Sequence, residues 1–401
     1  MTAIPGPRTL TDIEAALRAS FAADTCSPDD VERAPWTPEN PAWGHCDLTA
    51  LLVQDVFGGD LMAGRVLLGD EQQGFHMWNR LPGGVELDLT RDQFRRGQEV
   101  SPGWALRARP AGRLPRRWDE YQLLRRRVIG RLGPLRGVLE LADGRRLSYV
   151  DFGGPGRPVL ALHGHYQEAA SFARLARDLG PRWRLIAPDQ RGHGHSDRAP
   201  DYAREGYVAD AAALLEHLGT GPAVVLGHSL GGVNAYQLAA RRPDLVAALV
   251  VEDIGAEVDH DASAALEWPH REPTRAALLA AIGDAAEYLG DAVREYADGW
   301  GTAFAPVDMV ASQNRMNGAW WADWTGSECP ALLVRGTRSG VLGAEHAWEM
   351  VRRRPGTRLA ELPAGHLVRA TAPEAYAAEV RGFLEGLEGL EGVQGVEGVE
   401  I

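Results

Sequence analysis

The chain has 401 residues, of which 45% are hydrophobic and 24% charged, and its formal net charge is -13 at pH 7. This length exceeds one usual hydrophobic core, so two domains are expected, and the composition excludes a largely disordered or fibrous protein. The acidic balance argues against a nucleic-acid binder, because phosphate binding depends on clustered Lys and Arg.

The N-terminal residues, MTAIPGPRTLTDIEAAL, lack a cationic stretch followed by an apolar one, and no apolar run is long enough to span a bilayer. We therefore expect a cytoplasmic protein with no membrane partner. The three cysteines are Cys26, Cys46 and Cys329, without a C-x-x-C pair. That number and spacing argue against a disulfide framework and against a cysteine zinc site.

Residues 1–130 are expected to form a small α+β domain. LTDIEAALRASFAA predicts a first helix, and a second helix is predicted to begin at Cys46. GFHMWNRL and VELDLT predict two strands, joined by a turn at Pro82-Gly83-Gly84. The Arg- and Pro-rich stretch 107–135 is expected to be a solvated link to the next domain.

Residues 136–386 show the pattern of an α/β domain. Asp143-Gly144 lies between two alternating runs and predicts a hairpin. Apolar strands then alternate with helical segments, which implies a mostly parallel sheet covered on both faces; the strand candidates are 158–164, 183–189, 222–227, 246–253, 330–336 and 357–363. This rhythm breaks between 256 and 326, where we expect an inserted, largely helical lid. The repeat LEGLEGLEGVQGVEGVEI makes 387–401 a low-complexity tail, expected to be disordered.

PAVVLGHSLGGVNAYQLAARRP predicts a nucleophile elbow at Ser229, because Gly227-His228-Ser229-Leu230-Gly231 lies between an apolar strand and a helix. The serine of such an elbow occupies a tight, strained turn, and the flanking glycines avoid clashes with strand and helix. Upstream, His163-Gly164-His165 ends a strand where an oxyanion loop belongs. We predict that the backbone amides of His165 and Leu230 are its donors.

Two further segments complete the pattern. DQRGHGHSDR, from Asp189 to Arg198, follows the next strand, and PAGHLVRATAPEAYAAEVRGFL places His366 after the last strand. Together with the elbow, they resemble the α/β-hydrolase family and its esterase, lipase and carbon–carbon-bond hydrolase members. The resemblance covers residues 137–384 and implies an α/β-hydrolase fold. His366 is predicted to be the base that takes the Ser229 proton.

The acidic member of this triad is left open. Family members usually carry the acid a few positions beyond the strand that here is PALLVRG, but this chain has Gly336-Thr337-Arg338-Ser339-Gly340-Val341 there, and Glu345 follows too late. Some members supply the acid from the end of the preceding strand. We predict Asp253, which keeps the order Ser, acid, His. The alternatives are Glu252 and the absence of a working acid.

The N-terminal segment carries a second set of reactive residues. Cys46 is predicted at the start of a helix, where the helix dipole favours a thiolate, and His76 and Asp88 follow on successive strands. Cys, His and Asp in this order resemble the papain-like and transglutaminase-like arrangement. NPAWGHCDLTALLVQDVFGGDL with HMWNRLPGGVELDLT is similar to the YunG-like family of small bacterial proteins. A buried cysteine and a core histidine are the structural alternative.

The sequence therefore predicts a hydrolase that cleaves an ester, thioester, amide or related acyl bond through an acyl-Ser229 intermediate. The alternative is a weakened hydrolase domain that serves as a binding or regulatory module. No cofactor is implied and no metal, because backbone roles already explain His163, His165, His193 and His195. The lid aromatics either wall an apolar or aromatic substrate pocket or form the lid's own core; they are Trp268, Trp300, Trp320, Trp321, Trp324, Tyr288 and Tyr296.

Overall fold

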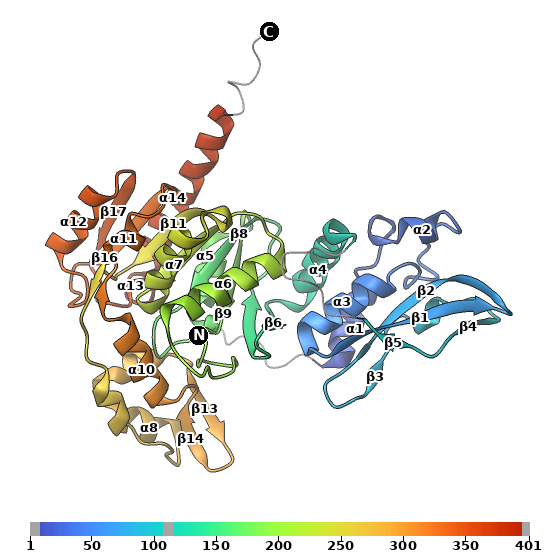
Figure 1. The fold of residues 1–401 in the computed structure, drawn as a ribbon, viewed down its shortest axis with the longest axis horizontal. Coiled ribbons are helices and arrows are strands. Elements are labelled where there is room, and N and C mark those ends of the chain that lie inside the picture. The colour runs from blue at the N-terminus through green and yellow to red at the C-terminus, as the bar shows by residue number, and fades with distance from the viewer. Residues whose placement is uncertain (1–8, 107–115, 395–401) are drawn as a thin grey trace, which may run out of the picture. The chain divides into compact units, whose positions relative to one another are not determined.

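The computed structural model describes residues 9–106 and 116–394. They divide into two compact units, the first of residues 9–140 with 151–154 and the second of 141–150 with 155–394 (Figure 1). No helix among these residues has both the length and the apolar content needed to cross a membrane.

The first unit combines helices with a five-stranded antiparallel sheet. The strand order is β3-β2-β1-β4, and β5 also pairs with β1. The two predicted helices and two predicted strands all form, while β1, β4 and β5 had not been predicted. The elements are α1 (Leu10–Arg18), α2 (Pro28–Val31), α3 (Cys46–Phe57), β1 (Asp60–Leu68), β2 (Glu71–Arg80), β3 (Glu86–Leu87), β4 (Gln98–Val100), β5 (Trp104–Ala105) and α4 (Trp118–Leu132).

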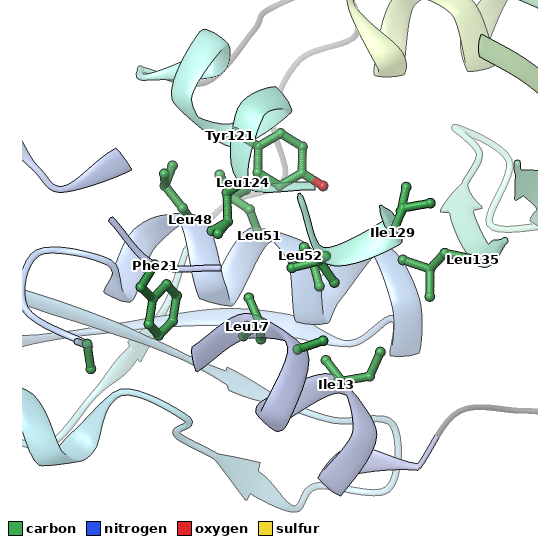
Figure 2. Packing of buried hydrophobic residues seen from close by; sticks show 13 residues of the cluster. Ile13, Leu17, Phe21, Leu48, Leu51, Leu52, Tyr121, Leu124, Ile129 and Leu135 are labelled. Carbon is green, nitrogen blue, oxygen red and sulfur yellow. The ribbon is translucent and has the colours of Figure 1, made fainter. Parts of the chain in front are cut away.

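The core of this unit lies between its helices, as Figure 2 shows. Ile13 and Leu17 from α1 pack with Leu48 and Leu52 from α3, and α4 adds Leu124. The expectation of a solvated link is therefore wrong for residues 118–132. The helix is rich in arginine, but its apolar positions recur at helical spacing and are buried. Residues 107–115 of the predicted link lie outside the described residues.

The second unit contains the strands β17-β16-β11-β10-β8-β9-β7 of an eight-stranded sheet, whose edge strand β6 is counted with the first unit. The six strands from β17 to β9 pair in parallel, and they are the six apolar segments that the sequence had indicated. This mainly parallel sheet, with helices between its strands, is the predicted α/β architecture. The strands are β6 (Leu135–Glu140), β7 (Arg146–Asp151), β8 (Arg157–Leu162), β9 (Trp183–Pro188), β10 (Ala223–His228), β11 (Val246–Glu252), β16 (Ala331–Gly336) and β17 (Thr357–Leu362).

Helices follow most of these strands, and their contacts define the layers beside the sheet. α6 packs against α7, which lies on β10 and β11, whereas α5 packs against α14. These helices are α5 (Ala173–Leu179), α6 (Arg204–Leu218), α7 (Leu230–Arg241), α12 (Ala344–Arg353), α13 (Val368–Thr371) and α14 (Pro373–Gln394). The expectation of a disordered tail from residue 387 is wrong as far as Gln394. Leu and Glu are strong helix formers and continue α14 despite the glycines; residues 395–401 lie outside the described residues.

The lid between β11 and β16 is less helical than predicted. Besides its helices it contains the hairpin β13–β14, whose turn is Ala297-Asp298, and the short pair β12–β15. A compact apolar cluster, including Leu278, Phe304 and Met309, holds it together. The elements are β12 (Glu257–Val258), α8 (Arg275–Ile282), α9 (Ala286–Leu289), β13 (Val293–Tyr296), β14 (Gly299–Thr302), α10 (Pro306–Met316), β15 (Gly318–Ala319) and α11 (Trp321–Trp324).

Candidate active site

Ser229 stands between β10 and α7, in a strained backbone conformation. Its φ of 51° and ψ of -117° lie in a region that non-glycine residues rarely adopt. The turn is also closely packed, because a Cβ on Gly231 would lie 2.0 Å from the Leu162 carbonyl oxygen. The Ser229 amide donates to the Glu252 carbonyl at 3.0 Å, which fixes the turn to the neighbouring strand. This geometry is that of the predicted elbow.

His366 follows β17 and meets the end of β11. Its Nδ1 lies 2.8 Å from Asp253 Oδ2. The Asp253 side chain is fully buried, and its Oδ1 accepts a hydrogen bond of 2.8 Å from the Gly336 amide. The Ser339 hydroxyl also donates to Oδ2. Asp253 therefore contacts His366 as an orienting carboxylate would, while the loop that usually carries the acid supplies donors to Asp253 instead.

Glu252, the alternative acid, is engaged elsewhere. Its carboxylate accepts from the Arg369 amide at 2.9 Å and from Arg369 Nη1 at 3.0 Å. The same guanidinium donates to Gln167, which lies in the loop after β8. Glu252 and Arg369 are both buried, so they form an internal ion pair that joins β11, the His366 segment and this loop. This pairing argues against Glu252 as the partner of His366.

The backbone of His366 also contacts the segment that carries Ser229. The His366 carbonyl lies 3.1 Å from His228 Nε2, and the two rings are 4.6 Å apart between centroids. His228 directly precedes Ser229, so these contacts bring the His366 segment to the turn that carries Ser229. Within the described residues, no hydrogen bond reaches the Ser229 hydroxyl. Such catalytic hydrogen bonds are often long in free enzymes and shorten when substrate binds.

The loop after β8 lies against the elbow. A Cβ on Gly164 would be 3.2 Å from Ser229 Cβ and 2.6 Å from His228 Nδ1, so only glycine permits this approach. The two predicted oxyanion donors belong to these segments, since Leu230 begins α7 and His165 follows Gly164. Neither amide hydrogen has an acceptor among the described residues. The prediction that these two amides are oxyanion donors is compatible with this arrangement.

The histidines near this loop are held in the neutral form. Burial lowers the pKa of His163 to about 3 and that of His193 to about 4. His163 Nε2 accepts from the Gln190 amide at 2.9 Å, which protonation would abolish. Over the described part of the chain, no three His, Cys, Asp or Glu side chains are grouped to hold a metal ion.

Most lid aromatics pack inside the lid or on its supports. Trp268 and Trp300 lie against the lid cluster, and Trp324 is fully buried. Trp321 stacks on His346 at 5.3 Å between centroids. Tyr288 is the aromatic that faces the site, since its ring centroid lies 6.1 Å from that of His366. The lid-core interpretation therefore holds for Trp268 and Trp300, whereas Trp321 and Trp324 pack outside the lid cluster.

In the first unit, part of the second predicted set comes together. His76 Nε2 lies 2.8 Å from Asp88 Oδ2, but the other ring nitrogen accepts from Gln93 Nε2 at 3.0 Å. Cys46 begins α3 as predicted, yet among the described residues it makes no hydrogen bond with His76. Burial, with a smaller contribution from Asp47, raises the thiol pKa to about 12, which argues against the expected thiolate.

Comparisons with known proteins match both parts of the chain. The family model described as alpha/beta hydrolase fold matches residues 157–373, and the one described as YunG protein matches 9–133. The 2-(acetamidomethylene)succinate hydrolase of Mesorhizobium japonicum is 30% identical over 253 residues, 58% of this chain and 89% of the relative. An esterase of Mycobacterium tuberculosis is 30% identical over 293 residues, 67% of this chain and 96% of the relative. The crystal structure of E-2-(acetamidomethylene)succinate hydrolase matches with a TM-score of 0.56 and 25% identity, over 63% of this chain and 99% of that chain.

Proposed function

The chain belongs to the alpha/beta hydrolase fold family, and on that premise we propose that it is a serine hydrolase that cleaves an acyl bond through an acyl-Ser229 intermediate. The observation that carries the proposal is the 2.8 Å contact between His366 Nδ1 and the Asp253 carboxylate. The sequence had left the acid open. A buried carboxylate on Nδ1 keeps the proton there and leaves Nε2 to accept the proton of the nucleophile.

The reaction then runs in two halves. His366 Nε2 takes the proton as Ser229 Oγ attacks the acyl carbon, and the amides of His165 and Leu230 stabilise the oxyanion. The tetrahedral intermediate collapses, the bond to the leaving group breaks, and His366 returns the proton to that group. Water next attacks the acyl enzyme, with His366 again the base, and the acid product leaves. Asp253 stabilises the imidazolium in both halves.

The substrate is proposed to be a small molecule with an ester, thioester, amide or related acyl bond. The two curated relatives are named as a hydrolase of a succinate derivative and as an esterase, which supports this class. Tyr288 beside His366 supplies one apolar wall. We propose a cytoplasmic enzyme of two domains divided between residues 130 and 136. The Cys46 geometry supports no thiol chemistry in the first domain.

The test is covalent labelling by a fluorophosphonate. The wild-type chain is expected to react once, with the label on the peptide that contains Ser229. Ser229→Ala should abolish labelling, and Ser263→Ala, at an exposed lid serine, should leave it unchanged. Circular dichroism checks that both variants fold. An unlabelled wild type, or equal labelling of Ser229→Ala, contradicts the proposal.

A further inference from the structure

Arg204 is a buried arginine whose charge the protein leaves unmatched. It begins α6 and is 3% exposed. Its Nε donates to Gln237 Oε1 at 3.3 Å, and the guanidinium lies 4.6 Å from the centroid of the Tyr207 ring. The two terminal nitrogens, Nη1 and Nη2, are buried and have no hydrogen-bond partner. An arginine normally uses these two groups to grip a carboxylate in parallel.

The carboxylates around Arg204 are committed to other cations or lie in solvent. Asp210 pairs with Arg191 at 2.8 Å and with Arg145 at 3.0 Å. Asp323 accepts from Gln237 Nε2 at 3.2 Å, and Glu205 extends into solvent. Arg204 itself forms no ion pair within the described residues.

A buried, unpaired cation is costly, because the charge has lost its water without gaining an anion. Burial also lowers the pKa of Arg204 to about 10. Unmatched, desolvated charges of this kind concentrate at functional sites, where a ligand supplies the missing partner.

The ring contact with Tyr207 and two further hydrogen bonds connect this arginine to the candidate active site. The Tyr207 hydroxyl, under the guanidinium, lies 2.8 Å from Ser312 Oγ, and Ser312 Oγ lies 2.8 Å from His165 Nε2. The His165 amide is one of the two proposed oxyanion donors. Ser312 belongs to α10 of the lid, so the lid takes part in this series of contacts.

We propose that Arg204 binds a carboxylate of the substrate, and hence that the natural substrates are acyl compounds with a carboxylate remote from the scissile bond. That the bound carboxylate belongs to a substrate rests on the proposed function, but anion binding at Arg204 does not depend on a reactive Ser229. The two carboxylate oxygens accept from Nη1 and Nη2, and the chain between the two ends of the substrate lies along the His165 loop.

Binding is measured by isothermal titration calorimetry on Ser229→Ala protein, with straight-chain dicarboxylates from glutarate to suberate as probes and their diamides as neutral controls. At least one dicarboxylate is expected to bind, and its diamide is not. Adding Arg204→Met should weaken binding about 10- to 100-fold, the usual effect of losing hydrogen bonds to a charged group. Arg204→Lys should retain part of the affinity, because the charge remains.

The matched control is Arg241→Met, which removes a neighbouring cation that Asp323 and Glu205 already engage. It should change the affinity less than about 3-fold, within the expectation for a surface charge. Thermal unfolding separates misfolding from lost binding. Dicarboxylate should raise the melting temperature of the Ser229→Ala protein and leave that of the Ser229→Ala, Arg204→Met double variant unchanged. Without ligand, the double variant should be at least as stable as the Ser229→Ala protein.

Several results would overturn the inference. The inference is wrong if no dicarboxylate binds the Ser229→Ala protein, if the diamides bind equally well, or if Arg204→Met binds as tightly as its parent. Inorganic phosphate that competes with equal affinity would reduce the site to a general anion site and refute the carboxylate substrate. Labelling of Ser229 without dicarboxylate binding refutes this inference alone, whereas Arg204-dependent binding without labelling refutes only the proposed hydrolase activity.

Discussion

Replacing Asp253 by Asn tests the assignment of the acid most directly. Three groups donate to the native carboxylate: the Gly336 amide and His366 Nδ1, each at 2.8 Å, and the Ser339 hydroxyl. An asparagine has one acceptor oxygen, and the Gly336 amide would hold it on the Oδ1 side. Its amide group would then face Nδ1, which must become an acceptor. The proton moves to Nε2, so His366 can no longer take the Ser229 proton.

The expected loss is large and specific to chemistry. The wrong tautomer lowers kcat about 10⁴-fold in serine hydrolases with this arrangement, which corresponds to roughly 5.5 kcal/mol in the barrier. The rate of fluorophosphonate labelling and kcat for an activated ester should fall together, while KM changes little. Ser339→Ala should cost only about 10-fold, because one donor is lost and the His366 contact remains.

The matched control is Asp244→Asn, an exposed aspartate that pairs with Arg242 after α7. It removes the same charge in the same unit and should leave the labelling rate unchanged. Circular dichroism and thermal unfolding must show that Asp253→Asn is folded. If the folded variant keeps its labelling rate within about 10-fold of wild type, Asp253 is not the orienting acid, and the reasoning from the 2.8 Å contact fails.

Three further results are expected. Gly231→Ala should lower the free energy of unfolding in urea by at least about 2 kcal/mol and abolish labelling, because its Cβ would meet a backbone oxygen of β8 at 2.0 Å; Gly382→Ala, with nothing nearer than 4.0 Å, is the control. Because burial lowers the pKa of His163 to about 3, the unfolded state binds the proton first, and the free energy of unfolding should fall as pH drops from 6.5. That loss is on the order of 3 kcal/mol by about pH 4, and calorimetry should find a flatter profile for His163→Gln. Iodoacetamide at neutral pH should alkylate Cys46 far more slowly than it alkylates the thiol of free glutathione, since burial raises the pKa of the Cys46 thiol to about 12. Rapid, selective modification of Cys46 would contradict this burial argument.

Local patterns in the sequence predicted most of the fold. The six parallel strands were predicted because each is a short apolar run with polar or glycine-rich ends, and both family resemblances are confirmed. The lid hairpin was missed although Asp298-Gly299, at the junction of its turn with the second strand, is a turn signal. The burial of α4 was missed because its arginines masked the apolar spacing of residues such as Leu124 and Val128.

In the candidate site, too, the residues in local motifs were predicted, and those that depend on distant contacts were not. Ser229 and His366 were predicted because each sits in a local motif. The choice between Glu252 and Asp253 could not be made from the sequence, because it depends on Arg369, which lies 117 residues from Glu252 and pairs with it in the folded chain. The donor role of Ser339 could not be predicted either, since nothing local distinguishes it from a loop serine. The pKa of Cys46 depends on tertiary burial, which outweighs its helix-start position.

The position of Asp253 also has a mechanical consequence. Its backbone turns out of β11 with a φ of 52°, and the chain enters the lid at β12 only a few residues later. The residue that contacts His366 thus also lies where the chain leaves the sheet for the lid. A lid that displaced the backbone between Asp253 and Glu257 would therefore shift the carboxylate that contacts His366. On the proposed function, exchanging the lid for that of a relative is expected to disturb turnover as well as selectivity.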